Sequence, residues 1–436
     1  MNRSDSAGSG ANLPALRSHN AALVLELLRT AGEAGISRIE LAGRTGLTPQ
    51  AVSKITARLR ADGFAAEAGH RASTGGKPRT VLRLVPGAAH AVGLHLDRDR
   101  VSAVLVDLAG TVVAVRSAEL DFGAGADAVV GPAAAVVTGA VTDAATGAAV
   151  ADAATGAVPR AVVADAARGA ATGAVSRAAV GDVVADAATG AVAGSAAVGP
   201  APSSVRPAVL GVGVAAPGPL DHDTGVLRRV TGFPQWDGYP LRDALAERLG
   251  LPVVLDKDTN AAALGLALRG PGDSFAYLHL GTGLGAGLVL GGTLYRGPRT
   301  GAGEFGHQTV QLDGPLCGCG GRGCVEALCL AAVAADDPAG AARFLGVGAA
   351  NLVRLLDVDR VLLGGRTVDA APDVFVRGVA AVLAERARHG GGGEPVPVEA
   401  AGGGRRLVAE GAAQLALAPV FGHFGRAAVP FNARRT

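Results

Sequence analysis

The chain has 436 residues, with 40 Lys and Arg against 38 Asp and Glu, and four cysteines. This length predicts two or three domains. The formal net charge of +2 excludes nucleic-acid binding through overall charge, so such binding would need a local basic segment. A polar N-terminal stretch, metal-like cysteine spacing and no uninterrupted apolar run of membrane length predict a cytoplasmic protein without a membrane span.

Residues 17–85 have the pattern of a winged helix-turn-helix. Ser37 and Glu40 form a capping box that begins a short helix. Thr48 is a good N-cap for the next helix, which runs to about Ala61 with one apolar side. Two helices joined by a short glycine-containing turn are typical of DNA-binding helix-turn-helix domains.

The polar face of that helix and the segment after it carry groups that bind DNA. Residues 64–84 alternate as strand, basic loop and strand, which predicts the wing of a winged helix. An ordinary helical hairpin with a solvated basic face is the alternative. The residues expected to contact base edges or phosphates are Gln50, Ser53, Lys54, Arg58, Lys77 and Arg79.

Residues 124–204 are of low complexity. The sequence DAATGA occurs at 143–148, 152–157 and 186–191, and large apolar residues other than Val are absent. Stacked repeats need large residues at fixed positions. We therefore expect a weakly structured surface insertion. The chain after 208 alternates strands and helices, which predicts an α/β fold.

The Gly-rich segment 301–326 holds one histidine and three cysteines that form a Cys₃His ligand set for a structural zinc ion: His307, Cys317, Cys319 and Cys324. Buried thiols in a flexible loop are the alternative. Glu304 and Glu326 flank these residues and suggest a polar ligand pocket, although either carboxylate could be a solvated surface group.

A second Gly-rich segment, GTGLGAG at 281–287, follows an apolar strand. Its backbone amides could hold a phosphate, but it lacks the Lys-Ser/Thr of a P-loop. A tight hairpin between two buried strands is an equally good interpretation.

Several motifs occur in a fixed order along the chain: STGGKPR, APGPLD, DKDTNAAAL, GTGLGAG, GEFGH and CGCGGRGCVEA. With them, about 17–122 and 208–417 resemble the ROK family (repressors, open reading frames and kinases), in the winged-helix branch related to xylose and N-acetylglucosamine repressors. The resemblance implies a winged helix-turn-helix over 17–85 and a two-lobed actin-like ATPase fold over 90–436. It implies zinc on His307, Cys317, Cys319 and Cys324, and sugar contacts from Asp258, Glu304, His307 and Glu326.

In the kinases of this family, the position of Asp258 is the general base. Those kinases also carry a glycine-containing phosphate loop near residue 97, where this chain has Asp97-Arg98-Asp99-Arg100. Bulky side chains and a carboxylate oppose the approach of phosphate to the backbone. Lys257 stands where the family often has an Asn that touches the sugar, and the segment after Glu326 is short for the family.

These features predict a DNA-binding regulator that responds to a sugar or sugar phosphate. An ATP-dependent sugar kinase with an added DNA-binding domain is the alternative, and a protein that binds DNA without any sugar is a third. Operators of winged-helix proteins are commonly two-fold symmetric, which predicts a homodimer, or a higher homo-oligomer, on two half-sites of duplex DNA.

Overall fold

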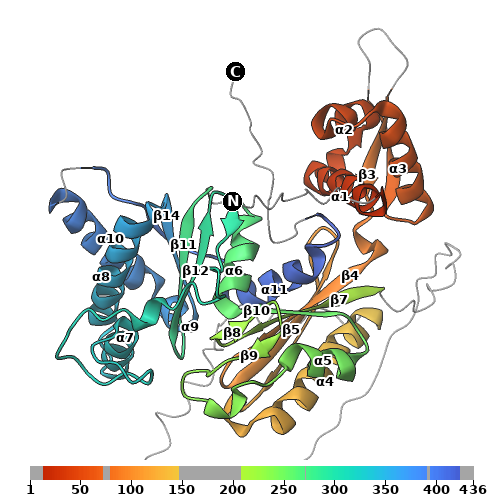
Figure 1. The fold of residues 1–436 in the computed structure, drawn as a ribbon. Coiled ribbons are helices and arrows are strands. Elements are labelled where there is room, and N and C mark those ends of the chain that lie inside the picture. The colour runs from red at the N-terminus through yellow and green to blue at the C-terminus, as the bar shows by residue number, and fades with distance from the viewer. Residues whose placement is uncertain (1–12, 72–78, 147–207, 271, 390–392, 423–436) are drawn as a thin grey trace, which may run out of the picture. The chain divides into compact units, whose positions relative to one another are not determined.

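The computed structural model describes residues 13–71, 79–146, 208–270, 272–389 and 393–422 (Figure 1). Its N-terminal part is a small domain of three helices and a three-stranded sheet of order β1-β3-β2. Its elements are α1 (Leu13–Ala31), β1 (Ile36–Ser37), α2 (Arg38–Thr45), α3 (Pro49–Ala61), β2 (Ala65–Arg71) and β3 (Arg79–Leu84).

The helix boundaries in this domain follow the expected capping chemistry. Ser37 accepts a hydrogen bond from the Glu40 amide while the Glu40 carboxylate accepts one from Ser37, so the capping box is complete. Gly46 ends α2 in the left-handed conformation, and the Thr48 hydroxyl caps α3 by accepting from the Ala51 amide. Val52 is fully buried on the inner side of α3. The helix-turn-helix predicted from the sequence is therefore present.

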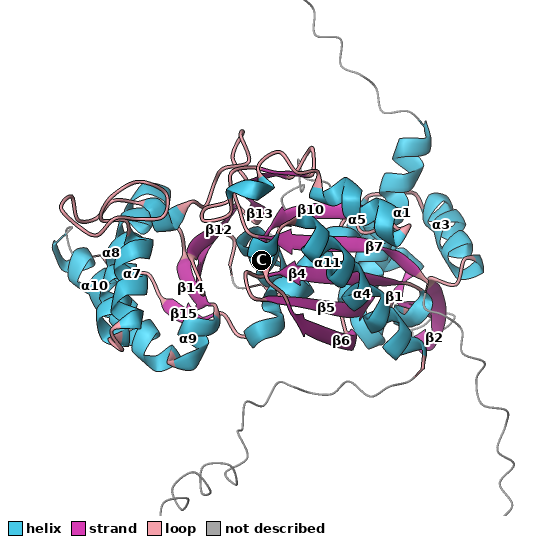
Figure 2. Cartoon of the chain, turned by 90° about the horizontal axis from the view of Figure 1, so that it is seen from below, coloured by secondary structure: helices cyan, strands magenta, loops and turns pink. Residues whose placement is uncertain are grey.

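The first lobe that follows has a five-stranded sheet of order β10-β7-β4-β5-β6. Strands β4, β7 and β10 are parallel, whereas β4, β5 and β6 form an antiparallel meander. Figure 2 shows these strands side by side. The elements are β4 (His90–Leu96), β5 (Arg100–Asp107), β6 (Val112–Glu119), α4 (Ala126–Ala145), β7 (Val209–Ala216), β8 (Leu220–Asp221), β9 (Val226–Leu227), α5 (Leu241–Leu249), β10 (Val253–Lys257) and α6 (Asp258–Ala267).

The second lobe has a similar five-stranded sheet of order β13-β12-β11-β14-β15. Strands β13, β12 and β11 pair antiparallel, whereas β11, β14 and β15 are parallel. Helices α8 and α10 pack against one another and close its hydrophobic core. The elements are β11 (Phe275–Leu280), β12 (Leu284–Leu290), β13 (Thr293–Leu294), α7 (Val325–Ala334), α8 (Pro338–Leu356), β14 (Arg360–Gly364), α9 (Arg366–Ala370), α10 (Pro372–His389) and β15 (Val398–Ala400). The last helix, α11 (Leu407–Leu417), returns to the first lobe and packs on its sheet.

Helix α11 packs directly on the backbone of its neighbours through small residues. A Cβ added at Gly93 of β4 would lie 1.8 Å from the Ala409 carbonyl oxygen, and one at Gly213 of β7 would lie 1.8 Å from that of Ala412. On the other side of α11, a Cβ at Gly411 would lie 1.9 Å from the Ala261 carbonyl oxygen in α6. These approaches need glycine because any side chain would overlap with a backbone atom.

The expectation of an insertion over 124–204 is wrong for its first part. Residues 126–145 form the ordered helix α4, whose Val129, Ala133, Val136 and Val137 are buried in the core of the first lobe. Small side chains suffice here because the sheet supplies the larger partners, such as the fully buried Leu105. The remainder of the low-complexity segment, residues 147–207, lies outside the described residues.

Two helices, α4 and α8, are long and apolar enough to cross a bilayer by length and composition alone. Each contributes buried side chains to a protein core, for example Val137 of α4 and Leu345 of α8. Burial of one face against other elements is the ordinary cause of such a composition in core helices.

Candidate functional site

The exposed face of α3 carries the predicted DNA-reading residues. Gln50, Ser53, Lys54 and Arg58 are all exposed, and Arg58 remains 83% exposed although it is 3.5 Å from Asp62. These side chains are therefore accessible to a binding partner along one face of the helix. Of the two wing cations, Arg79 is exposed at the start of β3, whereas Lys77 lies outside the described residues.

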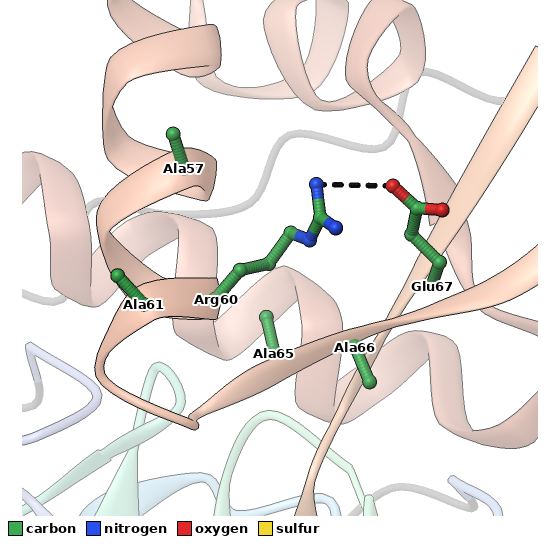
Figure 3. A pocket seen from close by; sticks show the side chains of 6 residues that line it. All are labelled: Ala57, Arg60, Ala61, Ala65, Ala66 and Glu67. Atoms are coloured by element: carbon green, nitrogen blue, oxygen red, sulfur yellow. Dashed lines mark ion pairs between the residues drawn. The ribbon is translucent and has the colours of Figure 1, made fainter.

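A small hollow lies between α3 and β2 and is lined by one further cation of α3, Arg60. Ala57, Ala61, Ala65 and Ala66 form its floor, and Figure 3 shows Arg60 of α3 pointing across it to Glu67 of β2. The Arg60 and Glu67 side chains form an ion pair of 3.0 Å. Arg60 is thus already paired within the protein and belongs to the contact between α3 and β2.

The predicted zinc ligands lie together in the second lobe. The ligand atoms of His307, Cys317, Cys319 and Cys324 all lie within 4.8 Å of one another. The Cys317 sulfur is 3.7 Å from His307 Nδ1, and the sulfurs of Cys319 and Cys324 are 3.8 Å apart. A tetrahedral ion with Zn–S bonds of about 2.3 Å requires sulfurs about 3.8 Å apart. The four residues therefore fit a zinc ion.

The chemistry of the thiols agrees with a cation at this cluster. Burial raises the pKa of Cys324 to about 12. A bound cation would supply the charge that converts such a thiol to thiolate at neutral pH. Gly323 beside it needs a left-handed backbone, with φ of 62°, which allows the loop to turn back on itself. The fourth cysteine, Cys329, is buried in α7 and donates to the Ala341 carbonyl at 3.5 Å, apart from this cluster.

All four predicted sugar contacts line one polar cleft. Asp258 begins α6, Glu304 and His307 come from the segment after β13, and Glu326 lies in the first turn of α7. Glu326 is 9% exposed and accepts a hydrogen bond from the Leu284 amide at 2.8 Å, which orients its carboxylate. Because Nδ1 of His307 faces the cysteines, its Nε2 is the nitrogen that remains for a ligand in the cleft.

Lys257 also lines this cleft, and its side chain is 4% exposed. Its ammonium group is 3.1 Å from Glu304 Oε1 and donates to the Ala302 carbonyl. The sequence alone marked Lys257 as a departure from the family, but it did not indicate that Lys257 is paired with a predicted sugar-binding carboxylate.

The turn 97–100, which connects β4 to β5, reaches into the cleft. Arg98 lies over the Phe233 ring at 5.2 Å, and it forms no ion pair with any residue that the structure describes. Asp99 forms a 2.6 Å ion pair with Arg366 at the start of α9. The Arg366 side chain also lies beside Gly281 of the GTG turn. The Asp99–Arg366 pair therefore joins the turn 97–100 to the start of α9 beside the GTG turn.

Two further residues line the cleft that the sequence analysis did not predict as site residues. His279 at the end of β11 accepts or donates a 2.8 Å hydrogen bond with the buried Tyr277 hydroxyl, and Asp97 at the end of β4 is 3.4 Å from the Thr282 hydroxyl. Burial acts to raise the pKa of Asp97, but His95 and the Arg98 amide outweigh it and lower the value. Their position at the ends of predicted strands was the only available signal.

Comparisons with known proteins agree with this architecture. A ROK family model matches residues 195–335, which contain Asp258, Glu304, Glu326 and the Cys₃His cluster, and a winged helix-turn-helix DNA-binding model matches 23–64. A glucokinase of Thermotoga maritima is 45% identical over 113 residues, which are 25% of this chain and 35% of the relative. A putative xylose repressor of a Caldicellulosiruptor species is 30% identical over 197 residues, or 35% and 49% of the two chains.

The matched stretches span half or less of the length of these relatives. A solved ROK family transcriptional regulator, described as a homolog of the E. coli MLC protein, has the same fold with a TM-score of 0.63 and 19% identity. That match covers 93% of this chain and 98% of the other.

The chain therefore has the architecture of a class of two-domain proteins, in which a helix-turn-helix domain precedes a duplicated α/β fold with a polar cleft. Within that class, residues 195–335 match the ROK family and residues 23–64 match winged helix-turn-helix DNA-binding domains.

Proposed function

We propose that this protein is a sugar-responsive, DNA-binding transcriptional regulator of the cytoplasm that acts as a homodimer on duplex DNA. The observation that carries the proposal is the combination in one chain of an exposed polar α3 face and a cleft lined by Asp258, Glu304, His307 and Glu326. Carboxylates suit sugar binding because each can accept hydrogen bonds from two neighbouring hydroxyls. The likeness to a putative xylose repressor supports the same function.

A structural zinc ion held by the Cys₃His cluster is part of this proposal. Four protein ligands leave no open coordination position, so the ion would stabilise the fold and would not activate water. When bound, it would fix the segment that carries Glu304, His307 and Glu326. The positions of these side chains in the cleft would then depend on the ion.

A sugar kinase is the second candidate, because Asp258 lines the cleft and part of the chain is similar to a glucokinase. The turn 97–100 argues against it. The Arg98 amide already donates to the Asp97 carboxylate at 2.7 Å, whereas phosphate binding needs unpaired amides. A repressor-type function therefore fits the cleft better.

We expect no phosphorylation of common hexoses above background in a coupled assay of ADP release. The physical reason is that the turn 97–100 contains no glycine and that its Arg98 amide is already bonded to the Asp97 carboxylate. The parent protein and Asp258→Asn should give the same trace. Turnover in the parent that disappears in Asp258→Asn would instead assign a base to Asp258 and favour the kinase.

For DNA binding, Arg79→Ala is expected to weaken the affinity for all sequences and to lower the salt slope by about one, since it removes a phosphate contact. Gln50→Ala should mainly relax the preference at one base pair, by about 1–3 kcal/mol if the contact is bidentate. Both are measured by titration of labelled operator at several salt concentrations.

Arg60→Gln is the matched control, because Arg60 is another cation of the same domain but is paired with Glu67. Its salt slope should equal that of the parent. An equal loss of slope in Arg60→Gln and Arg79→Ala would remove Arg79 from the DNA interface. Failure of genomic footprinting to find any preferred site would contradict the proposed function as a DNA-binding regulator.

A further inference from the structure

Lys257 is an almost fully enclosed lysine at the junction of β10 and α6. It is the last residue of β10, where its backbone pairs with Ala216 of β7, and its side chain is 4% exposed. Lysine is rarely buried to this degree unless its charge is paired. The pairing therefore indicates a specific role for this ammonium group in the cleft.

The surroundings of the side chain hold it in one place. Its methylene groups pack on Gly218, where an added Cβ would lie 2.6 Å from Lys257 Cδ. Its Nζ donates to the Ala302 carbonyl and to Glu304 Oε1, the latter at 3.1 Å. A side chain fixed along its length and at its end loses little further conformational entropy when a ligand binds.

The ammonium group still has a donor to offer. It carries three N–H groups, and the described part of the chain supplies hydrogen-bond acceptors for two of them. Lys257 also lines the cleft beside Glu304 and Asp258. An unmade hydrogen bond at so enclosed a charge is costly, so an acceptor atom of a ligand is the natural partner of the third N–H.

We propose that Lys257 is a specificity-determining residue for the effector. It selects ligands that place an oxygen acceptor next to the Lys257–Glu304 pair, and it rejects ligands that place an amine there. A hydroxyl satisfies both partners, because it accepts from Lys257 Nζ and donates to the Glu304 carboxylate. A ligand ammonium group has no lone pair to offer Lys257 and is repelled by its charge. This inference rests on the proposed sugar-sensing function and names the effector class as a hydroxyl-bearing, non-cationic sugar at this point.

The test uses the full-length, zinc-loaded protein and isothermal titration. A panel of neutral monosaccharides first identifies the sugar that binds best. Analogues of that sugar, each with one hydroxyl replaced by an amine, are then titrated into the parent and into Lys257→Gln. In the parent, at least one amine should weaken binding tenfold or more. We define the amine penalty as the Kd of the amine analogue divided by the Kd of the parent sugar. Lys257→Gln should reduce this ratio several-fold, since a neutral amide can accept a hydrogen bond from an ammonium group.

Two further variants separate specificity from folding. Arg343→Gln, an exposed change on α8, should keep the parent's ratio. Lys257→Arg keeps a charged donor and should also keep the rejection of the amine. A loss of rejection in Lys257→Arg would count against the proposal even if Lys257→Gln failed to fold.

The outcomes are distinguishable. If the parent binds a sugar but Lys257→Gln shows an unchanged amine penalty, or no amine is penalised, the role of Lys257 is wrong and the sugar-sensing function stands. If the parent binds none of the neutral sugars, both this inference and the proposed function are overturned.

Discussion

Replacement of Gly411 by alanine is expected to destabilise the protein by about 3 kcal/mol or more, because the new methyl group would overlap with backbone. Its Cβ would lie 1.9 Å from the Ala261 carbonyl oxygen and 2.5 Å from the Ala261 carbonyl carbon. Neither atom can rotate away as a side chain can. Relief requires α6 and α11 to separate, which would disturb the packing of α11 on the first-lobe sheet.

Denaturant unfolding followed by fluorescence measures this effect in the first lobe. Trp236, the only tryptophan of the chain, is fully buried there. Gly131→Ala is the matched control, since Gly131 lies in α4 of the same lobe with no atom within 4 Å of an added Cβ. This control should be neutral or gain about 0.5–1 kcal/mol from helix propensity. A Gly411→Ala protein as stable as Gly131→Ala would show that the two helices can move apart freely.

Cys319→Ser is expected to lose tight zinc binding and, with it, the response to sugar. Cys319 is exposed, so the substitution removes little packing and acts mainly through the metal. Without the ion, the loop that holds Glu304 and His307 loses its cross-link, and the cleft carboxylates lose their fixed geometry. The winged helix should stay folded, because its ordered elements end before the metal segment begins.

Metal analysis after dialysis and sugar titration of the same samples measure both effects. Cys329→Ala is the matched control: this cysteine is buried apart from the cluster and should leave zinc content unchanged. Full zinc occupancy in Cys319→Ser would remove it from the ligand set. A normal sugar response from a zinc-free protein would show that the ion and the cleft are independent.

The amino-acid sequence determined the features that depend on neighbouring residues. The start of α2 follows from the hydrogen bonds that Ser37 and Glu40 exchange over three positions, and the start of α3 follows from the Thr48 hydroxyl. The clustering of Cys317, Cys319 and Cys324 was also predictable, because they are close in sequence and a glycine-rich chain brings them together. Local chemistry is sufficient in each case, since the interacting atoms lie within about one turn or loop.

Only the tertiary structure decided the features that need a distant partner. The helix α4 exists because the first-lobe sheet buries its small side chains, although its composition alone resembles a loose insertion. The pairing of Lys257 with Glu304 joins residues 47 positions apart, and that of Asp99 with Arg366 joins residues 267 positions apart. Burial and pairing set the role of such charges, and neither can be read from residue type or spacing.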